Sequence, residues 1–209
     1  MYSFNKFLWL FIIPILAFST RYAPVKENPP KNKLFKWAVQ KTSTLRILGS
    51  TNMNSFGCDI TGYYQPDTIV CLDESAASKL VTLKGELEID IFKFDCHNKM
   101  LTNDLRKTLK ANSHPNFIIR FLSLERMPVI QNEKDCLRGW VEIELAGTTR
   151  RFEVNYTFTK TSTSAIQLNG TRNFNFADFK LTPPKKIAGL IKVKDKFNVD
   201  FNLLLNPVQ

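Results

Sequence analysis

The chain has 209 residues and a formal net charge of +10, from 29 lysines and arginines against 19 aspartates and glutamates. A chain of this size can bury one good core, and 44% of its residues are hydrophobic, so we expect a single folded domain. The basic residues are scattered and form no dense tract with aromatic residues, which argues against nucleic-acid binding, whereas the positive charge fits a solvated surface, an anionic membrane surface or an acidic polymer.

Residues 1–19 have the features of a signal peptide. A lysine is followed by an apolar run over residues 7–18, which is too short to span a membrane as a helix. Residues 17–19, Ala-Phe-Ser, have the small-x-small form of a cleavage site. We therefore predict a cleaved signal peptide and export to the periplasm or out of the cell. An uncleaved anchor is the alternative.

The following residues predict a linker and then a series of β-strands. Residues 20–42 are polar, with three prolines and many lysines, and we interpret them as a linker that runs into a first strand near residues 37–39. The folded domain is expected over residues 43–209. Apolar and acidic residues alternate with the period of a strand most clearly over residues 86–91. The expected strands cover residues 44–60 in two pieces, 68–71, 86–91, 117–124, 137–145, 151–158, 166–168 and 197–205.

One short helix interrupts the strands within residues 92–121. Leu101, Leu105 and Leu109 are four apart, so they share one face of a helix. Asn103–Asp104 is the expected N-cap, because these side-chain oxygens can accept from the free amides of the first turn. A lone helix of about two turns is not stable in water, so its apolar face must pack across a sheet or the open end of a barrel.

Many antiparallel strands, short turns and one helix predict an all-β protein, a closed antiparallel barrel of about eight strands with the short helix capping it. Alternate residues of every strand converge inside such a barrel. These side chains either fill the interior or line an apolar tunnel that holds a ligand. The candidate lumen residues are Leu87, Ile89, Ile91, Phe117, Ile119, Phe121, Val141, Ile143, Phe152, Val154, Tyr156, Phe158, Phe197, Val199, Phe201 and Leu203.

The sequence predicts neither a catalytic centre nor a metal site. His97 and His114 are the only histidines, neither lies in a nucleophile motif, and both are expected at exposed loop positions. The aspartates form no paired-carboxylate pattern, and the cysteines lack the C-x-x-C spacing of zinc sites. We therefore expect a protein that is not an enzyme and has no cofactor other than a bound lipid.

Four cysteines follow the expected signal peptide. Because an exported protein reaches an oxidising compartment, this even number predicts two disulfides. The spacing alone leaves three pairings open.

Four stretches resemble the YceI-like family, the polyisoprenoid-binding, lipocalin-like proteins of the bacterial periplasm. No single stretch is specific, but their order and spacing together match the family over about residues 44–205. The stretches are GSTNMNSFGC at residues 49–58, a strand-helix-strand from Phe94 to Phe121, ELAGTTR at residues 144–150, and the C-terminal part from Phe179 to Phe201.

The resemblance implies a lipocalin-like barrel with a helix over it and, in some members, a long isoprenoid chain such as a quinone tail in the lumen. The chain departs from the better-known pattern at Asn103, where an arginine usually precedes the aspartate, and in having four cysteines. Cys58 and Cys96 both fall at strand positions within the resembling stretches. The resemblance therefore favours the pairs Cys58–Cys96 and Cys71–Cys136.

The leading hypothesis is an exported periplasmic barrel that binds an apolar isoprenoid, an isoprenoid quinone or another lipid in its lumen. One alternative is an integral outer-membrane barrel, which is disfavoured because half of the strand positions would face lipid and no aromatic girdles are evident. Another is a structural periplasmic domain with a filled core and no ligand. The sequence makes no prediction of the oligomeric state.

Overall fold

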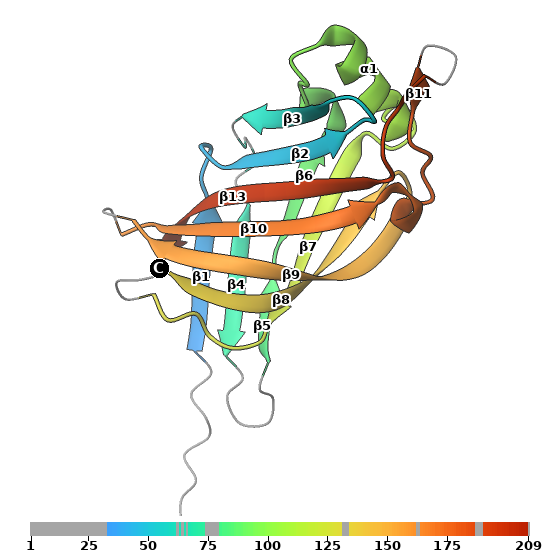
Figure 1. Cartoon of the computed structure of the whole chain (residues 1–209). Coiled ribbons are helices and arrows are strands. Elements are labelled where there is room, and N and C mark those ends of the chain that lie inside the picture. The colour runs from blue at the N-terminus through green and yellow to red at the C-terminus, as the bar shows by residue number, and fades with distance from the viewer. Residues whose placement is uncertain are drawn as a thin grey trace, which may run out of the picture.

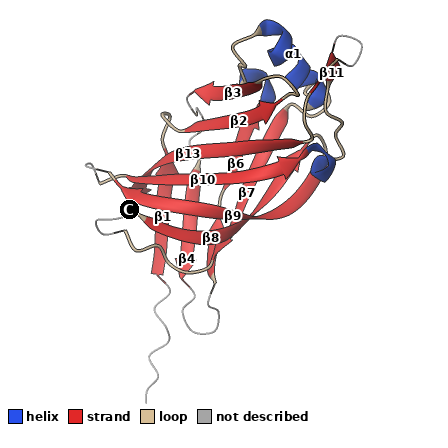
Figure 2. Cartoon of the chain, viewed as in Figure 1, coloured by secondary structure: helices blue, strands red, loops and turns tan. Residues whose placement is uncertain are grey.

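The computed structural model describes residues 33–61, 63, 65, 67–73, 80–130, 134–161, 164–186 and 190–208. The expected signal peptide and the first part of the expected linker lie outside these residues. The described chain is mostly β-strand and carries one short α-helix at one end (Figures 1 and 2).

Eight antiparallel strands close into a barrel, as predicted. Each strand pairs with the next in the order given below, and the last pairs back with the first, so this ring has no free edge. The strands are β1 (Lys33–Val39), β4 (Thr68–Asp73), β5 (Val81–Lys84), β7 (Asn116–Leu124), β8 (Asp135–Leu145), β9 (Thr148–Lys160), β10 (Ile166–Asn175) and β13 (Lys196–Val208).

The strand expected near residues 37–39 is present as the end of β1, which begins at Lys33 within the segment predicted as a linker. The folded domain therefore begins before residue 43. Trp37 and Val39 are buried, and β1 pairs with β4 on one side and with β13 on the other. The barrel could not close without this strand, which explains why a polar, lysine-rich segment becomes part of the wall.

The barrel wall divides at the end that carries the helix. The C-terminal half of β13 pairs with β1, whereas its N-terminal half pairs with β2 (Thr44–Ser50). The C-terminal half of β7 likewise pairs with β5, and its N-terminal half with β6 (Glu86–Asp90). Strand β3 (Ser55–Thr61) pairs with β2. At this end the wall therefore finishes in two edge strands, β3 and β6, that are not paired with each other; we call the line between them the seam.

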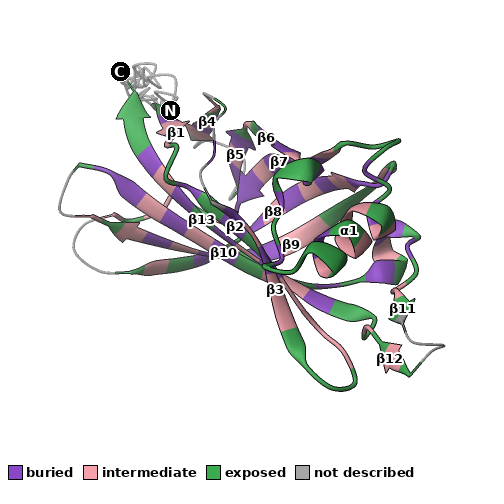
Figure 3. Ribbon diagram, turned by 90° about the horizontal axis from the view of Figure 1, so that it is seen from above, coloured by how far each residue is buried: buried purple, intermediate pink, exposed green. Residues whose placement is uncertain are grey.

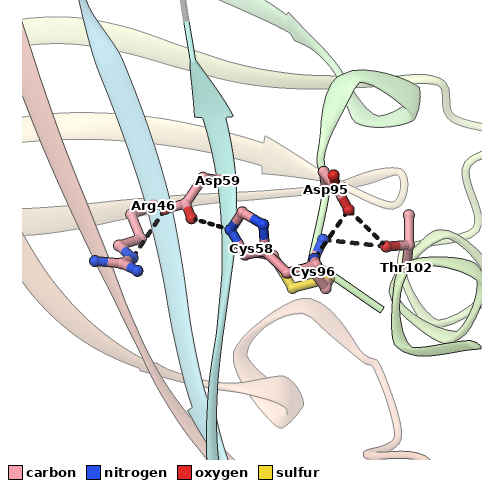
Figure 4. A network of polar contacts seen from close by, with 7 residues as sticks. Arg46, Cys58, Asp59, Asp95, Cys96 and Thr102 are labelled. Carbon is pink, nitrogen blue, oxygen red and sulfur yellow. Dashed lines mark hydrogen bonds and ion pairs between the residues drawn. A yellow bond between two sulfur atoms is a disulfide. The ribbon is translucent and has the colours of Figure 1, made fainter. Parts of the chain in front are cut away.

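Several contacts cross the seam, and Figure 4 shows the disulfide and the residues beside it. A disulfide joins Cys58 of β3 to Cys96, which follows β6 in the chain. Next to it, Asp59 and Asp95 exchange two backbone hydrogen bonds of 2.8 and 3.1 Å. Further along, the Tyr63 hydroxyl accepts a hydrogen bond of 3.2 Å from the backbone N–H of Glu88 in β6. One covalent bond and a few hydrogen bonds thus connect β3 to the β6 side of the wall, whereas full strand pairing connects neighbours elsewhere.

Polar side chains hold the two sides of the disulfide in place. The Asp59 carboxylate pairs with Arg46 Nε at 2.8 Å and with His97 Nε2 at 3.0 Å. The Asp95 carboxylate accepts from the His97 backbone N–H at 2.9 Å. Thr102 accepts from the Cys96 N–H at 3.0 Å. The chain on both sides of Cys96 is therefore fixed to β3 and to the helix (Figure 4).

Helix α1 (Lys99–Thr108) packs its leucine face on the end of the barrel. Leu109 is buried, and Leu101 and Leu105 pack against the core, which confirms the predicted face. The predicted N-cap is wrong. Asn98 caps the helix, because its Oδ1 accepts from the backbone N–H groups of residues 100 and 101 at 2.9 and 3.1 Å.

Three shorter elements lie around α1 and the open end. They are the 3₁₀ turns η1 (Ile91–Lys93) and η2 (Phe176–Phe179) and a hairpin of β11 (Lys185–Lys186) and β12 (Ile191–Lys192). The hairpin lies close to α1 in Figure 1. Together they surround the end of the barrel at which the wall divides.

The Cys58–Cys96 disulfide is present as predicted, but the predicted pair Cys71–Cys136 is wrong. Cys71 is buried inside the barrel, where its thiol lies 3.4 Å from the Met127 sulfur. Cys136 is exposed on β8, next to the Thr157 hydroxyl. One side chain points into the barrel and the other out of it, so the two sulfur atoms cannot meet.

We expect the variant Cys58→Ser/Cys96→Ser to lose stability. The disulfide links residues 38 apart, and a loop of that length restricts the unfolded chain by about 3–4 kcal/mol. Chemical denaturation of the oxidised protein and of the double variant measures the difference. Cys136→Ser is the control, because it removes an exposed thiol outside the disulfide. Equal losses in both variants would contradict a role for the seam.

Candidate functional site

The predicted lumen residues converge on one core. All except Phe152 are buried, and Phe152 is half-buried against the same cluster. Buried and exposed positions alternate along the strands that carry them (Figure 3). The alternation therefore located the interior of the barrel, and contact of these residues with a ligand stays a prediction.

An almost entirely apolar cavity lies between α1 and the open end of the barrel; we call it the end cavity. Its volume is about 40 Å³. Asp104 and Thr108 are its only charged or hydroxyl-bearing lining side chains. The lining residues are Ile47, Gly49, Phe56, Leu101, Asp104, Leu105, Thr108, Leu109, Phe117, Leu145, Phe176, Pro184, Val193, Phe197 and Val199.

Only Phe117, Phe197 and Val199 of the predicted lumen residues line the end cavity. The other walls come from strands β2, β3 and β8, from α1 and η2, and from Pro184 and Val193 beside β11 and β12. The leucine face of α1 was the signal that could have located this site, since it had to cover the open end of the barrel. The strand pattern did not indicate which strand ends and turns meet beneath the helix.

Two smaller cavities of about 10 Å³ continue into the barrel. The inner cavity shares Phe117 and Val199 with the end cavity, so these two side chains form a neck between them. The other cavity follows the seam and touches Ile60 of β3 and Ile89 of β6. The interior is thus mostly filled by side chains. The remaining small cavities extend from the end covered by α1 into the barrel.

Aromatic rings contribute to this filling. The Phe201 ring lies directly on the backbone of Gly170, in the space that a Cβ atom would take there. Its centroid is 6.4 Å from that of Phe121 and 5.9 Å from that of Tyr156. Glycine at position 170 therefore lets the ring lie against the wall beside the inner cavity.

Two buried tyrosines differ in how their hydroxyl groups are paired. Tyr156 is fully buried, and its hydroxyl has no hydrogen-bond partner among the described residues. Tyr63 is also buried, but its hydroxyl donates to the Asp67 carboxylate and accepts from the Glu88 backbone N–H. Burial raises the pKa of both phenols, and Asp67 raises that of Tyr63 further. Both groups are therefore neutral at physiological pH.

Neither histidine takes part in a metal-binding group. Both are exposed, as predicted: His97 pairs with Asp59, and His114 lies against Gly147. In the part of the chain that the structure describes, no three His, Cys, Asp or Glu side chains are placed to hold a metal ion. Within that same part, no helix is long and apolar enough to cross a membrane.

The two tyrosines give a test of the interior with opposite signs. Tyr156→Phe should raise the free energy of unfolding by about 1 kcal/mol, because it removes a buried hydroxyl without a partner. Tyr63→Phe should lower it by about 1–3 kcal/mol, because a buried N–H loses its acceptor. Thermal or urea denaturation of both variants gives the values. Destabilisation by Tyr156→Phe would mean that a water molecule or a ligand pairs with that hydroxyl.

Comparisons with known proteins agree with this architecture. No curated protein matches the chain. Among solved structures, a polyisoprenoid binding domain from Saccharophagus degradans is 12% identical with a TM-score of 0.58, and the match covers 83% of this chain and 99% of that one. Burkholderia cenocepacia BcnA is 14% identical with a TM-score of 0.57, and 78% of this chain and 95% of that one are covered. These likenesses show a shared fold.

The match to a family model is more specific than the shared fold. The model of the YceI-like domain matches residues 37–205, a range that begins within β1 and ends within β13. It therefore includes most of the closed barrel, the seam and helix α1. The chain belongs to the YceI-like domain family.

Proposed function

We propose that the chain is an exported periplasmic protein whose barrel binds an apolar isoprenoid or a similar lipid without catalysing a reaction. The observation that carries this proposal is the end cavity, an almost entirely apolar space at the point where the barrel wall divides. A hydrocarbon chain in such a space gains affinity from the apolar area removed from water, at roughly 25 cal/mol per Å². The fold shared with a polyisoprenoid binding domain supports the same assignment.

A long chain needs more room than the cavities now offer. The end cavity and the inner cavity measure about 40 and 10 Å³, so an isoprenoid tail has to displace side chains at the neck and beyond it. The Phe201 ring is the first candidate, because it rests on Gly170 beside the inner cavity. The rival interpretation is a core that stays filled, and it predicts no such movement.

The outer wall supports a protein in water and not an integral membrane barrel. Arg120 of β7 pairs with Glu86 of β6 at 2.6 Å and with Glu142 and Glu144 of β8 at 3.3 and 3.0 Å. This charged row lies across three neighbouring strands, on the face opposite to the buried residues. An integral barrel carries apolar side chains at such outward positions.

Export is supported by the signal-peptide features of residues 1–19 and by the disulfide. Disulfides persist in oxidising compartments, which an exported chain reaches. The N-terminal residue of the protein isolated from its own cells tests this part of the proposal, since cleavage after Ser19 leaves Thr20 as the first residue.

Val199→Phe should weaken lipid binding at the neck. Val199 lines both the end cavity and the inner cavity, so a phenyl ring there narrows the path between them. We expect the affinity for a long-chain isoprenoid alcohol, measured by fluorescence titration, to fall by about tenfold or more, because roughly 60 Å² of apolar contact is lost.

Val39→Phe is the matched control. Val39 is a buried valine of β1 that lines none of the three cavities, and overpacking either site costs about 1–3 kcal/mol of stability. Equal stability losses with a binding defect in Val199→Phe alone support the proposal. A native protein that binds no isoprenoid contradicts it.

We also infer that the end of the barrel near α1 contacts an anionic membrane surface. The turn between β2 and β3 is tied to the β11–β12 hairpin, since Asn52 Nδ2 donates to the Leu190 carbonyl and Asn52 Oδ1 accepts from the Lys192 N–H, both at 3.0 Å. Met53 and Leu190 are 71% and 70% exposed on these tied turns. Two large apolar side chains are thus held in water beside the end cavity.

Several lysines lie on the same hairpin and directly after it. Lys185 and Lys192 face each other across the hairpin, and Lys194 follows. The ion pairs among the described residues use arginines or His97, so these three lysines have no counter-charge there. Like charges placed opposite each other are destabilising, and anionic headgroups would relieve their repulsion.

Lys192→Gln/Lys194→Gln should lower binding to vesicles that contain about 30% phosphatidylglycerol by about thirtyfold, since each of the two lysines near such a surface contributes about 1 kcal/mol. Vesicle co-sedimentation measures the partition coefficient. Lys134→Gln/Lys160→Gln removes the same charge at the opposite end of the barrel and should have little effect. Equal effects of the two double variants would contradict docking through this end.

A further inference from the structure

Arg172 is a charged side chain at an inward-facing position of the barrel. Its neighbours two residues away on β10, Gly170 and Phe174, are both buried on the inner face, and Arg172 follows the same alternation. It lies opposite the buried Val199 in the pairing of β10 with β13. With Val199 and Phe201 it lines the inner cavity. A cationic group therefore borders the narrow space that is otherwise lined by apolar side chains.

Two aromatic rings, those of Phe152 and Phe174, lie beside this guanidinium. Its central carbon lies 5.0 Å from the centre of the Phe152 ring and 5.8 Å from that of Phe174. One N–H donates to the backbone carbonyl of Glu153, just beyond the point where β9 and β10 stop pairing. Within the described part of the chain no carboxylate forms an ion pair with Arg172, and its Nε is buried without an acceptor.

This arrangement is costly for the protein alone. A guanidinium keeps its charge at any physiological pH, and a partly buried charge is unfavourable unless it is paired and hydrogen-bonded. The contact with the Glu153 carbonyl uses one of five N–H donors, and the two rings compensate only part of the charge. The Glu153 carbonyl lies just beyond the paired part of β9 and β10, and an uncharged donor could serve it as well as a cation. Its need for a donor therefore does not explain an arginine at position 172.

We propose that Arg172 anchors the anionic head, a phosphate or a carboxylate, of an amphiphilic ligand whose chain occupies the apolar interior. The assignment rests on the proposed lipid-binding function and adds the chemical class of the head group. An anionic oxygen accepts charge-assisted hydrogen bonds from the Nε–H that lacks an acceptor, and the fork of a guanidinium matches phosphate and carboxylate oxygens. A purely apolar ligand, or a neutral quinone, would leave the charge uncompensated.

Matched ligand pairs test the head group separately from the chain. Geranylgeranyl monophosphate is compared with geranylgeraniol, and palmitate with hexadecanol, by titration of the whole protein. We expect the native protein to bind the anionic member of at least one pair about tenfold more tightly, the typical effect of one charge-assisted interaction. A preference within the geranylgeranyl pair identifies a phosphate head group, and a preference within the palmitate pair identifies a carboxylate.

Arg172→Met should abolish the preference and leave the affinity for the alcohols within about twofold. Arg172→Gln is the second uncharged variant, to be used if Arg172→Met lowers the melting temperature, because it keeps a donor for the Glu153 carbonyl. Arg150→Met is the control, since Arg150 is exposed and lines none of the cavities described.

Equal binding of anion and alcohol by the native protein overturns the proposal, and so does a preference that survives both Arg172 variants. Absence of binding to all four ligands would instead contradict the proposed lipid-binding function.

Discussion

The structure depends on sealing an apolar interior behind a wall that strand pairing does not complete. Eight strands close the barrel at one end, but at the other end the wall finishes in the edges of β3 and β6. The Cys58–Cys96 disulfide, the Asp59–Asp95 backbone pair and the Tyr63 hydroxyl span that gap, and α1 covers the opening. An edge strand in water invites pairing with another chain. A covalent link at this point therefore holds the two edges together beside the core.

The same division of the wall creates the site. Because β7 and β13 are long enough to serve two neighbours each, the strands spread apart towards α1, and the leucine face of the helix meets them across the end cavity. The end cavity and the opening in the wall thus have one origin. The neck at Phe117 and Val199 connects the end cavity to the inner cavity, which Arg172 borders. An apolar chain with a polar head fits these two connected cavities better than a hydrocarbon alone.

Local patterns predicted the parts of the structure that follow from periodicity. Alternation located the interior face of the long strands, and the four-residue spacing of leucines located the apolar face of α1. The N-cap was misplaced because Asn98 and Asn103 are equally suitable residues, and the fixing of the chain beside Cys96 decides between them. The Cys71–Cys136 pair failed because a cysteine count does not say on which side of a wall each thiol lies.

The start of β1 and the position of Arg172 were missed for a different reason. The residues before Trp37 were expected in a linker, but β1 begins at Lys33 and pairs on both sides. Arg172 of β10 looks solvated in the sequence, but the strand register places it on the inner face. Only tertiary contacts carry that information. The end cavity was missed in the same way, since its walls come from strand ends, from α1 and η2 and from residues beside β11 and β12, which are brought together by the fold alone.

Mass spectrometry of the organic extract of the protein, purified without detergent from its own cells, tests the central claim most directly. A lipid-binding interior predicts one class of long-chain lipid in an amount approaching one molecule per chain. Protein that is unfolded before extraction should have lost this lipid. An extract that contains no lipid above the level of a mock purification, from a protein with its disulfide intact, would contradict the account and favour a filled core.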